Sequence, residues 1–302
     1  DAQPRSRLRR VNPLFALSRA VLLRASRAAA LGDLVQRTAW GRRSVRRFVA
    51  GDTIGAAVAA AEGMRALGYL ATLDRLGEAS VGARADTYAA DAVTLLRAQA
   101  AAGLEPNVSV KLTALGLAEG RAAARLDEIL RVAREVRGFV RVDAEHPESL
   151  DALHEIVLAA RAAGRPIGTV VQANLRRSAV DCDRLLAAGV PIRLVKGAYD
   201  PGADGVGEPS AVDAAFLDLA SHLLAASVPL AFGTHDERIL AHLEERSRGR
   251  AEAQLLYGVR SDLADRLLGA GWRVRIYTPY GPDWWPYALR RMAERPANLR
   301  FV

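Results

Sequence analysis

The sequence predicts an α/β protein built as a (β/α)8 barrel of the TIM type. From residue 66 onward, short apolar and β-branched runs alternate with Ala, Leu, Arg and Glu segments of helical periodicity. This alternation favours a parallel sheet with crossover helices. Eight such runs are spread over about 230 residues, which fits a barrel of eight units, whereas an open doubly wound sheet usually has fewer strands.

The expected strands are short segments that begin or end at a polar or turn-forming residue. They span residues 67–74, 108–113, 139–145, 168–173, 192–198, 230–235, 253–258 and 273–279. Helices are expected between them, for example over 123–136, 149–164 and 261–271. No Pro- or Gly-rich linker divides this region, so we expect one catalytic barrel over 66–302, preceded by a basic helical segment over 1–65. A final helix after the last strand is expected to lie over the barrel rim.

The amino-acid composition indicates a protein with a large core and a cytoplasmic location. Hydrophobic residues make up 50% of the 302 residues, enough for a large core. The single cysteine, Cys182, excludes an internal disulfide framework, lies in a helical stretch, and is expected to be packed rather than nucleophilic. The sequence has no run of about 18 apolar residues that would span a membrane. We therefore expect a cytoplasmic protein.

Positive charge is concentrated at the N-terminal end. Residues 1–50 hold 12 Arg and two acidic residues, whereas the chain as a whole carries a net charge of +8. Three interpretations remain open: an Arg-rich helix packed on the body, a reversible contact with an anionic membrane surface, or a nucleic-acid arm. The segment contains few aromatic residues, which disfavours the nucleic-acid arm.

Polar or charged residues stand at the ends of most expected strands. In a barrel the C-terminal strand ends meet at one face, where reactive groups gather. A single residue of this kind would be an ordinary solvated loop residue, but six strand ends converging on one rim indicate a site. The residues are Lys111, Asp143, Gln172, Lys196, Thr234 with His235, and Tyr277.

Several chemistries have no supporting motif. The five His lack metal-ligand spacing, HExxH is absent, and no metal is expected. The phosphate loop GxxxxGK and the dinucleotide motif GxGxxG after a strand are both missing, and the Gly-rich stretch 202–207 has the wrong spacing.

The segment after the eighth strand carries an arginine pair. Tyr287, Arg290 and Arg291 are spaced i, i+3 and i+4, which places them on one helix face. Glu294 could satisfy Arg290 in a self-contained surface cluster. Alternatively, the paired guanidinium groups bind a carboxylate, whose geometry they match. The helix follows the last strand and so is expected on the same rim as Lys111, which favours a small carboxylate substrate.

Only two of the 42 Lys and Arg residues are Lys: Lys111 and Lys196, each at the end of a β-branched run. A compact ammonium on a flexible stem differs from a guanidinium in what it can do. Lys111 is a candidate third carboxylate partner. Lys196 precedes Gly197, where the backbone could approach a ligand closely.

These motifs together resemble the proline dehydrogenase family. The stretches VSVKLTALG, RVDAE, VVQANLRR, RLVKGAY, GTHD, AQLLYG and RIYTPYGPDWWPYALRRMAERPAN occur in the family's order over roughly residues 46–302. The resemblance implies a distorted (β/α)8 barrel that holds FAD without a Rossmann unit, in agreement with the missing GxGxxG. It also implies oxidation of L-proline to 1-pyrroline-5-carboxylate, by hydride transfer from C5 to flavin N5, as the first step of proline catabolism.

The resemblance further implies roles for individual residues. The proline carboxylate would bind Arg290 and Arg291 with help from Lys111, and Tyr277, Tyr287 and Leu256 would line the substrate pocket. Asp143 would order this cationic region, and Arg193 would lie beside flavin N5. The remaining FAD-binding residues would be Ala144, Gln172, Lys196, Gly197, Ala198, Thr234 and His235.

The electron acceptor implied by the family is a membrane quinone, which would give the basic N-terminus a role in peripheral contact with the inner face of the membrane. Asn174 stands where the family often has an aromatic residue, and the chain is expected to be monofunctional. Two rival functions remain open: a Schiff-base aldolase that uses a strand-end lysine, and a non-enzymatic basic-arm binding protein.

Overall fold

A computed structural model describes residues 47–284 and 287. The chain divides into two compact units, Ala50–Pro282 and the pair of segments Asp1–Val49 and Asp283–Val302. The first unit is the barrel described below. Residues 1–46 of the basic helical segment expected over 1–65 lie outside the described residues, as does most of the expected final helix, including Arg290 and Arg291.

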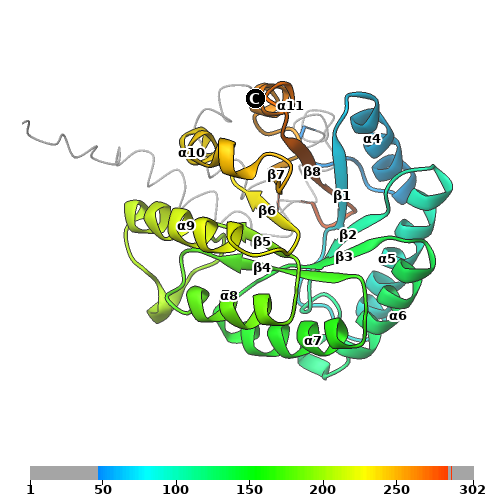
Figure 1. Cartoon of the computed structure of the whole chain (residues 1–302). Helices are drawn as coiled ribbons and strands as arrows, with labels where there is room; N and C mark the ends of the chain where they lie inside the picture. The colour runs from blue at the N-terminus through cyan, green and yellow to red at the C-terminus, as the bar shows by residue number, and fades with distance from the viewer. Residues whose placement is uncertain (1–46, 285–286, 288–302) are drawn as a thin grey trace, which may run out of the picture. The chain divides into compact units, whose positions relative to one another are not determined.

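Eight parallel strands form a closed barrel in sequence order, with β8 paired to β1 (Figure 1). Each predicted strand is present, and the predicted (β/α)8 barrel is confirmed. The strands are β1 Leu70–Arg75, β2 Asn107–Val110, β3 Phe139–Val142, β4 Ile167–Gln172, β5 Ile192–Val195, β6 Leu230–Gly233, β7 Ala251–Leu256 and β8 Arg273–Tyr280.

Helices surround the strands on the outside of the barrel (Figure 1). One helix precedes β1, and one follows each of the first seven strands. They are α4 Ile54–Ala66, α5 Ala83–Ala101, α6 Ala122–Glu135, α7 Leu150–Ala162, α8 Ser178–Ala187, α9 Pro209–Leu224, α10 Glu237–Ser247 and α11 Ser261–Gly269. Short 3-10 turns lie at Leu117–Glu119, Pro147–Ser149 and Gly202–Asp204. Among the described residues, no helix is both long and apolar enough to cross a bilayer.

Successive side chains along each strand point alternately into the apolar core and into the barrel interior. On β3, Val140 and Val142 are fully buried and belong to the apolar core, as Leu194 does on β5. Their neighbours Arg141 and Arg193 point the other way, into the barrel, where both are more than 90% buried. Barrel interiors are usually filled by branched apolar side chains. Here much of the interior is occupied by charged and hydrogen-bonded groups, which places polar chemistry at the centre of the fold.

Candidate active site

Asp143 is the centre of a cluster at the C-terminal face of the barrel. It follows the last residue of β3, so its carboxylate lies at the strand end. Arg193 Nη1 donates to Oδ1 at 2.9 Å, and the Ser109 hydroxyl donates to the same oxygen at 2.7 Å. The Tyr277 hydroxyl donates to Oδ2 at 2.8 Å. Donors from β2, β5 and β8 thus fix this carboxylate in one orientation.

Lys111 is held by a second carboxylate from β1. Its Nζ donates to the two oxygens of Asp74 at 3.0 and 3.2 Å and lies 3.8 Å from Asp143. Burial raises the pKa of Asp74 to about 6, even though the Lys111 charge opposes this shift. Burial acts to lower the pKa of Lys111, but Asp74 together with Tyr277, Tyr88 and Asp143 outweighs it, and the net pKa lies well above its usual value. At pH 7 the pair is therefore ionised.

Arg193 connects the cluster to β7. Its Nε donates to Oε1 of Gln254 at 2.6 Å, and its guanidinium lies 5.3 Å from the centre of the Tyr277 ring. Its Nη2 is buried and has no hydrogen-bond partner among the described residues. Because an unpaired buried donor is unfavourable, this atom is suited to an acceptor that a ligand would bring.

Tyr277 remains a neutral donor at all physiological pH values. Burial raises the pKa of its hydroxyl well above the usual value, and the negative charges of Asp143 and Asp74 act in the same direction. It can therefore present a hydroxyl and a flat aromatic face, but not a phenolate. Leu256 lies opposite Tyr277 in the β7–β8 register.

A second group of the predicted residues lies at the ends of β4, β5 and β6. Gln172 is buried and donates to the backbone oxygen of Glu145 at 3.0 Å. Lys196 bonds to Asp213 of α9 and to Asp236, the N-cap of α10, the latter at 2.9 Å. The Lys196 ammonium thus ties two helices to the end of β5.

The loops beside this group bring backbone close to side chains. The Thr234 hydroxyl accepts from the backbone N–H of Asp236 at 3.1 Å, and Nε2 of His235 accepts from the backbone N–H of Leu256 at 3.1 Å. Gly197 has a φ of +114°, and a Cβ there would lie 2.1 Å from Oδ1 of Asn174. Only glycine fits at this position.

The structure thus brings together Lys111, Asp143, Arg193 and Tyr277, which the sequence predicted from separate strand ends. Gln172, Lys196, Gly197, Thr234 and His235 share the neighbouring strand ends, with Ala144 buried after Asp143 and Ala198 exposed after Gly197. Tyr287 is buried and belongs to the second compact unit.

Sequence reasoning missed Asp74, Ser109 and Gln254. Asp74 carries a signal of the kind that identified Lys111, because it stands near the end of the first strand. Ser109 and Gln254 lie within their strands. The sequence shows that each is a polar residue in an alternating pattern, but it does not show which residue each one bonds to.

Comparison with known proteins identifies the family. Residues 57–302 match the family model described as proline dehydrogenase. Proline dehydrogenase 1 of Bacillus subtilis is 35% identical over 275 residues, which cover 87% of this chain and 91% of the relative. Proline dehydrogenase of Deinococcus radiodurans is 35% identical over 271 residues, covering 85% of this chain and 87% of the relative.

A solved structure agrees on the fold. Proline utilization A (PutA) from Bdellovibrio bacteriovorus, inactivated by N-propargylglycine, superimposes with a TM-score of 0.78 at 24% identity. The match covers 84% of this chain, which spans about a third (33%) of the PutA chain. The chain belongs to the proline dehydrogenase family, the oxidoreductases that act on proline in the first step of its catabolism.

Proposed function

We propose that the protein oxidises L-proline to 1-pyrroline-5-carboxylate with FAD at the C-terminal face of its barrel. The observation that carries this proposal is the fixed carboxylate of Asp143, surrounded by Arg193 of β5, Tyr277 of β8 and Lys111, which follows β2. Such an arrangement holds charge in place before the reaction, which is how a protein stabilises a charge that develops in the transition state.

The residues at the strand ends fit a flavin, the cofactor that family membership supports. Arg193 Nη2 is a buried donor without a described partner, and it would bind an acceptor on the flavin ring. Gly197 follows β5 and Gly233 ends β6, and an added Cβ would press on Asn174 at the first position and on Val195 at the second, so the packing of these strand ends requires glycine. Gln172, Lys196, Thr234 and His235, with Ala144 and Ala198, would line the rest of the FAD site.

When bound, the flavin supplies the two-electron acceptor for the hydride that leaves proline C5. The substrate nitrogen also loses a proton, so that the C5–N bond becomes the double bond of the imine. The role of Asp143 is to hold Arg193 and Tyr277 in place. Tyr277 and Leu256 would form walls of the pyrrolidine site, and Tyr287 would add a third.

The substrate carboxylate would bind the cationic groups. The Lys111 ammonium is buried and keeps its charge because of Asp74. A carboxylate that enters beside it meets a cation already desolvated and oriented, and such charge-assisted hydrogen bonds are strong. Arg290 and Arg291 would complete this carboxylate site from the C-terminal segment.

The electrons must then leave the protein, and we propose a quinone as the acceptor. Twelve Arg among residues 1–50 would support a reversible contact with anionic lipid. Deleting residues 1–45 should abolish co-sedimentation with vesicles that contain anionic lipid. Unchanged sedimentation of the truncated protein would contradict the membrane contact.

The rival aldolase is not supported. A lysine that forms a Schiff base must lose its proton, whereas Asp74 holds the pKa of Lys111 well above its usual value. Lys196 is bonded to two carboxylates. A basic-arm binding protein on an inert barrel does not account for a catalytic face built from ionised groups.

Two optical measurements test the proposal. Acid-released flavin, separated by chromatography, should be FAD, and anaerobic addition of L-proline should bleach the flavin absorbance of the intact protein. D-proline serves as the control and should bleach it far more slowly. A protein that binds no flavin after reconstitution would contradict the proposal, and a flavin that L-proline leaves unbleached would contradict the substrate.

A further inference from the structure

The opposite face of the barrel holds a cavity of about 230 Å³ that the oxidation of proline does not use. It lies where strands begin rather than end: Asn107, Phe139, Leu230, Ala251 and Arg273 are the first residues of β2, β3, β6, β7 and β8. Four guanidinium groups and only two carboxylates line it, those of Arg141, Arg250, Arg273, Arg275, Glu105 and Glu252. The charged lining is therefore net positive.

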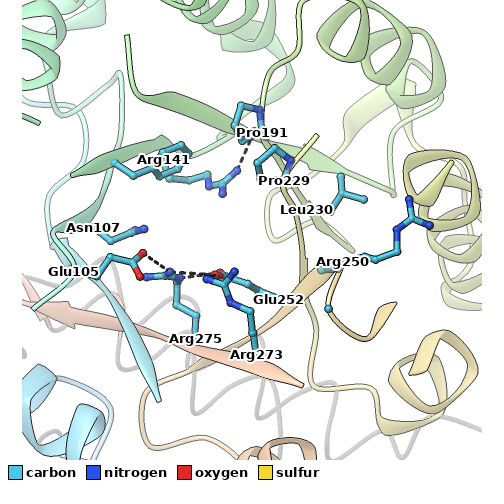
Figure 2. A pocket seen from close by; sticks show the side chains of 13 residues that line it. Glu105, Asn107, Arg141, Pro191, Pro229, Leu230, Arg250, Glu252, Arg273 and Arg275 are labelled. Atoms are coloured by element: carbon cyan, nitrogen blue, oxygen red, sulfur yellow. Dashed lines mark hydrogen bonds and ion pairs between the residues drawn. The ribbon is translucent and has the colours of Figure 1, made fainter. Parts of the chain in front are cut away.

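Figure 2 shows Arg141 extending into the cavity from one side, with Arg275, Arg273 and Glu252 on the other. Arg141 is 93% buried, since its relative exposure is 7%. Its Nη1 donates to two backbone oxygens, those of Thr169 and Pro191, both at 3.0 Å. It forms no ion pair with a carboxylate within residues 47–284. A buried guanidinium without a counter-ion is unfavourable.

Both carboxylates of the cavity pair with two of its other arginines, Arg273 and Arg275, and not with Arg141 or Arg250. Glu252 accepts from Arg275 Nε at 2.8 Å and from Arg273 Nη2 at 3.1 Å. Glu105 accepts from Arg275 Nη2 at 2.7 Å. The positive charge that remains belongs to Arg141 and Arg250.

Like Arg141, Arg250 forms no ion pair with a carboxylate of the described residues. Its Nη2 donates instead to the backbone oxygen of Ala226 at 3.3 Å. It is exposed, at the mouth of the cavity. One buried and one exposed cation thus line the same cavity, and neither forms an ion pair with a carboxylate of the described residues.

The buried cation is built into the fold. Gly168 of β4 lies where a Cβ would come within 3.0 Å of Arg141 Nη1 and 2.7 Å of the Phe139 ring. The Arg141 guanidinium also lies 5.0 Å from the centre of that ring. The absence of a side chain at residue 168 therefore gives Arg141 the room to lie across the barrel mouth.

The pKa of Arg141 also indicates that its buried charge is unfavourable without a bound anion. Burial lowers the pKa of Arg141 to about 9; the nearby positive charges of Arg193 and Arg275 add to this effect, and the negative charges of Glu252 and Asp143 offset only part of it. A bound anion would remove much of that unfavourable interaction.

We propose that this cavity is a binding site for a small oxyanion of the phosphate class, with Arg141 at its base and Arg250 at its entrance. Guanidinium groups match the oxygen geometry of phosphate. The cavity is smaller than the roughly 300–1,000 Å³ of pockets that enclose drug-sized ligands, which favours inorganic phosphate over a nucleotide. The site lies at the other end of the barrel from the flavin site and does not depend on the proposed function.

Calorimetric titration of the full-length, flavin-loaded protein with inorganic phosphate tests this site. Ionic strength is held constant with potassium chloride, so that general screening does not change. We expect saturable binding with a stoichiometry of one phosphate that is lost on Arg141→Gln. Arg250→Gln should weaken binding several-fold while proline oxidation remains unchanged. The matched control is Arg238→Gln, an arginine on α10 that is 87% exposed and does not line the cavity, and it should leave binding unchanged.

Two results would overturn the proposal. One is the absence of saturable phosphate binding to the unmodified protein. The other is equal affinity in Arg250→Gln and the unmodified protein, which would assign the bound phosphate to other arginines, including the 11 among residues 1–46. Arg250 is exposed, so this variant should fold even if Arg141→Gln does not, and the test remains decisive.

Discussion

At the residue scale, the two lysines of the chain illustrate how partners decide what a cation can do. Lys111 is buried beside Asp74 and Asp143 in the barrel. Lys196 is bonded to Asp213 and Asp236 outside the strand end, with about a third of its side chain exposed. The first is positioned to hold a substrate carboxylate, and the second holds the helices that flank the proposed cofactor site.

The two lysine variants should therefore separate two functions. Lys111→Met should raise the KM for L-proline by at least about 10-fold, the value of one charge-assisted hydrogen bond, with flavin still bound. Lys196→Met should lower the flavin content of the purified protein with a smaller change in KM. Steady-state kinetics and the ratio of flavin to protein absorbance measure both. A Lys111 variant with loss of flavin and normal KM would contradict the assignment.

The pH dependence of catalysis should report the state of Asp74. Its pKa of about 6 lies above the usual value, so Asp74 becomes protonated as the pH falls through 6 and Lys111 then loses its nearest counter-ion. We expect kcat/KM to decline below about pH 6 in the unmodified protein. In Asp74→Asn this decline should disappear, with activity low at all pH values. An identical acid limb in the variant would assign the limb to another group.

At this scale the sequence predicted where the polar site residues stand, but not which of them form hydrogen bonds with one another. The strand-end rule identified Lys111, Asp143 and Tyr277 because a polar residue after an apolar run is visible in the sequence. It could not show that Ser109 and Arg193 both donate to the same oxygen of Asp143. Such pairs depend on the tilt and register of strands far apart in the chain.

At the scale of elements, six of the eight strands end earlier than the sequence predicted, whereas β1 and β8 end one residue later. The segment expected to be extended over 192–198 stops at Val195, because Gly197 takes a positive φ and turns the chain. The expected strand over 108–113 stops at Val110, where Leu115 N–H bonds back to the Lys111 carbonyl in a turn. Each lysine is followed by further apolar or small residues, Leu112 in one segment and Ala198 in the other, and this conceals the turns in the sequence.

The turn at Gly197 should be sensitive to any side chain. A Cβ there would clash with Asn174, and the positive φ adds strain. We expect Gly197→Ala to lower the free energy of unfolding by about 2 kcal/mol or more and to reduce flavin binding. Gly202→Ala is the matched control, because Gly202 also has a positive φ but no atom within 4 Å of the added Cβ. It should have a smaller effect, about 1 kcal/mol. Urea unfolding measures both, and equal losses would contradict the role of the contact.

At the scale of the whole barrel, the ion pairs of the interior join strands that close the cylinder. Arg275 of β8 donates to Glu252 of β7 and to the backbone oxygen of Ala71 in β1, and it also pairs with Glu105 before β2. Gln254 continues the chain of hydrogen bonds from Glu252 to Arg193. The number of expected strands was enough to predict the closed barrel. It did not predict this polar interior, because the alternation of side chains along a strand shows which face a residue occupies and not which residue lies opposite it.

Breaking this network should destabilise the fold. Glu252→Gln leaves the buried Arg275 with a weaker partner, and we expect a loss of about 3 kcal/mol in the free energy of unfolding. Glu237→Gln is the matched control, because it breaks the exposed pairs with Arg260 and Arg266; surface pairs contribute about 0–1 kcal/mol. Equal losses in the two variants by urea unfolding would contradict a special role for the interior pair.

The same pair has a defined pH dependence. Burial opposes ionisation of Glu252, but the hydrogen bond and charge of Arg275, with the hydrogen bond of Gln254 and the charge of Arg273, together outweigh burial and lower its pKa below the usual 4.5. Because the folded-state pKa is the lower one, the stabilisation is fully present above about pH 4.5 and is lost as the pH falls through the folded-state pKa. The difference in stability between Glu252→Gln and the unmodified protein should therefore shrink on acidification, and a constant difference would contradict this account.

The central claim is that the carboxylate of Asp143 organises the reactive face of the barrel. Anaerobic single-turnover reduction of the flavin by L-proline in Asp143→Asn tests this most directly, since it is independent of the electron acceptor. We predict a reduction rate at least about 100-fold lower than in the unmodified protein, the range seen when a fixed electrostatic group is removed, with the flavin spectrum and content retained. A rate within a few-fold of the unmodified protein would contradict the claim.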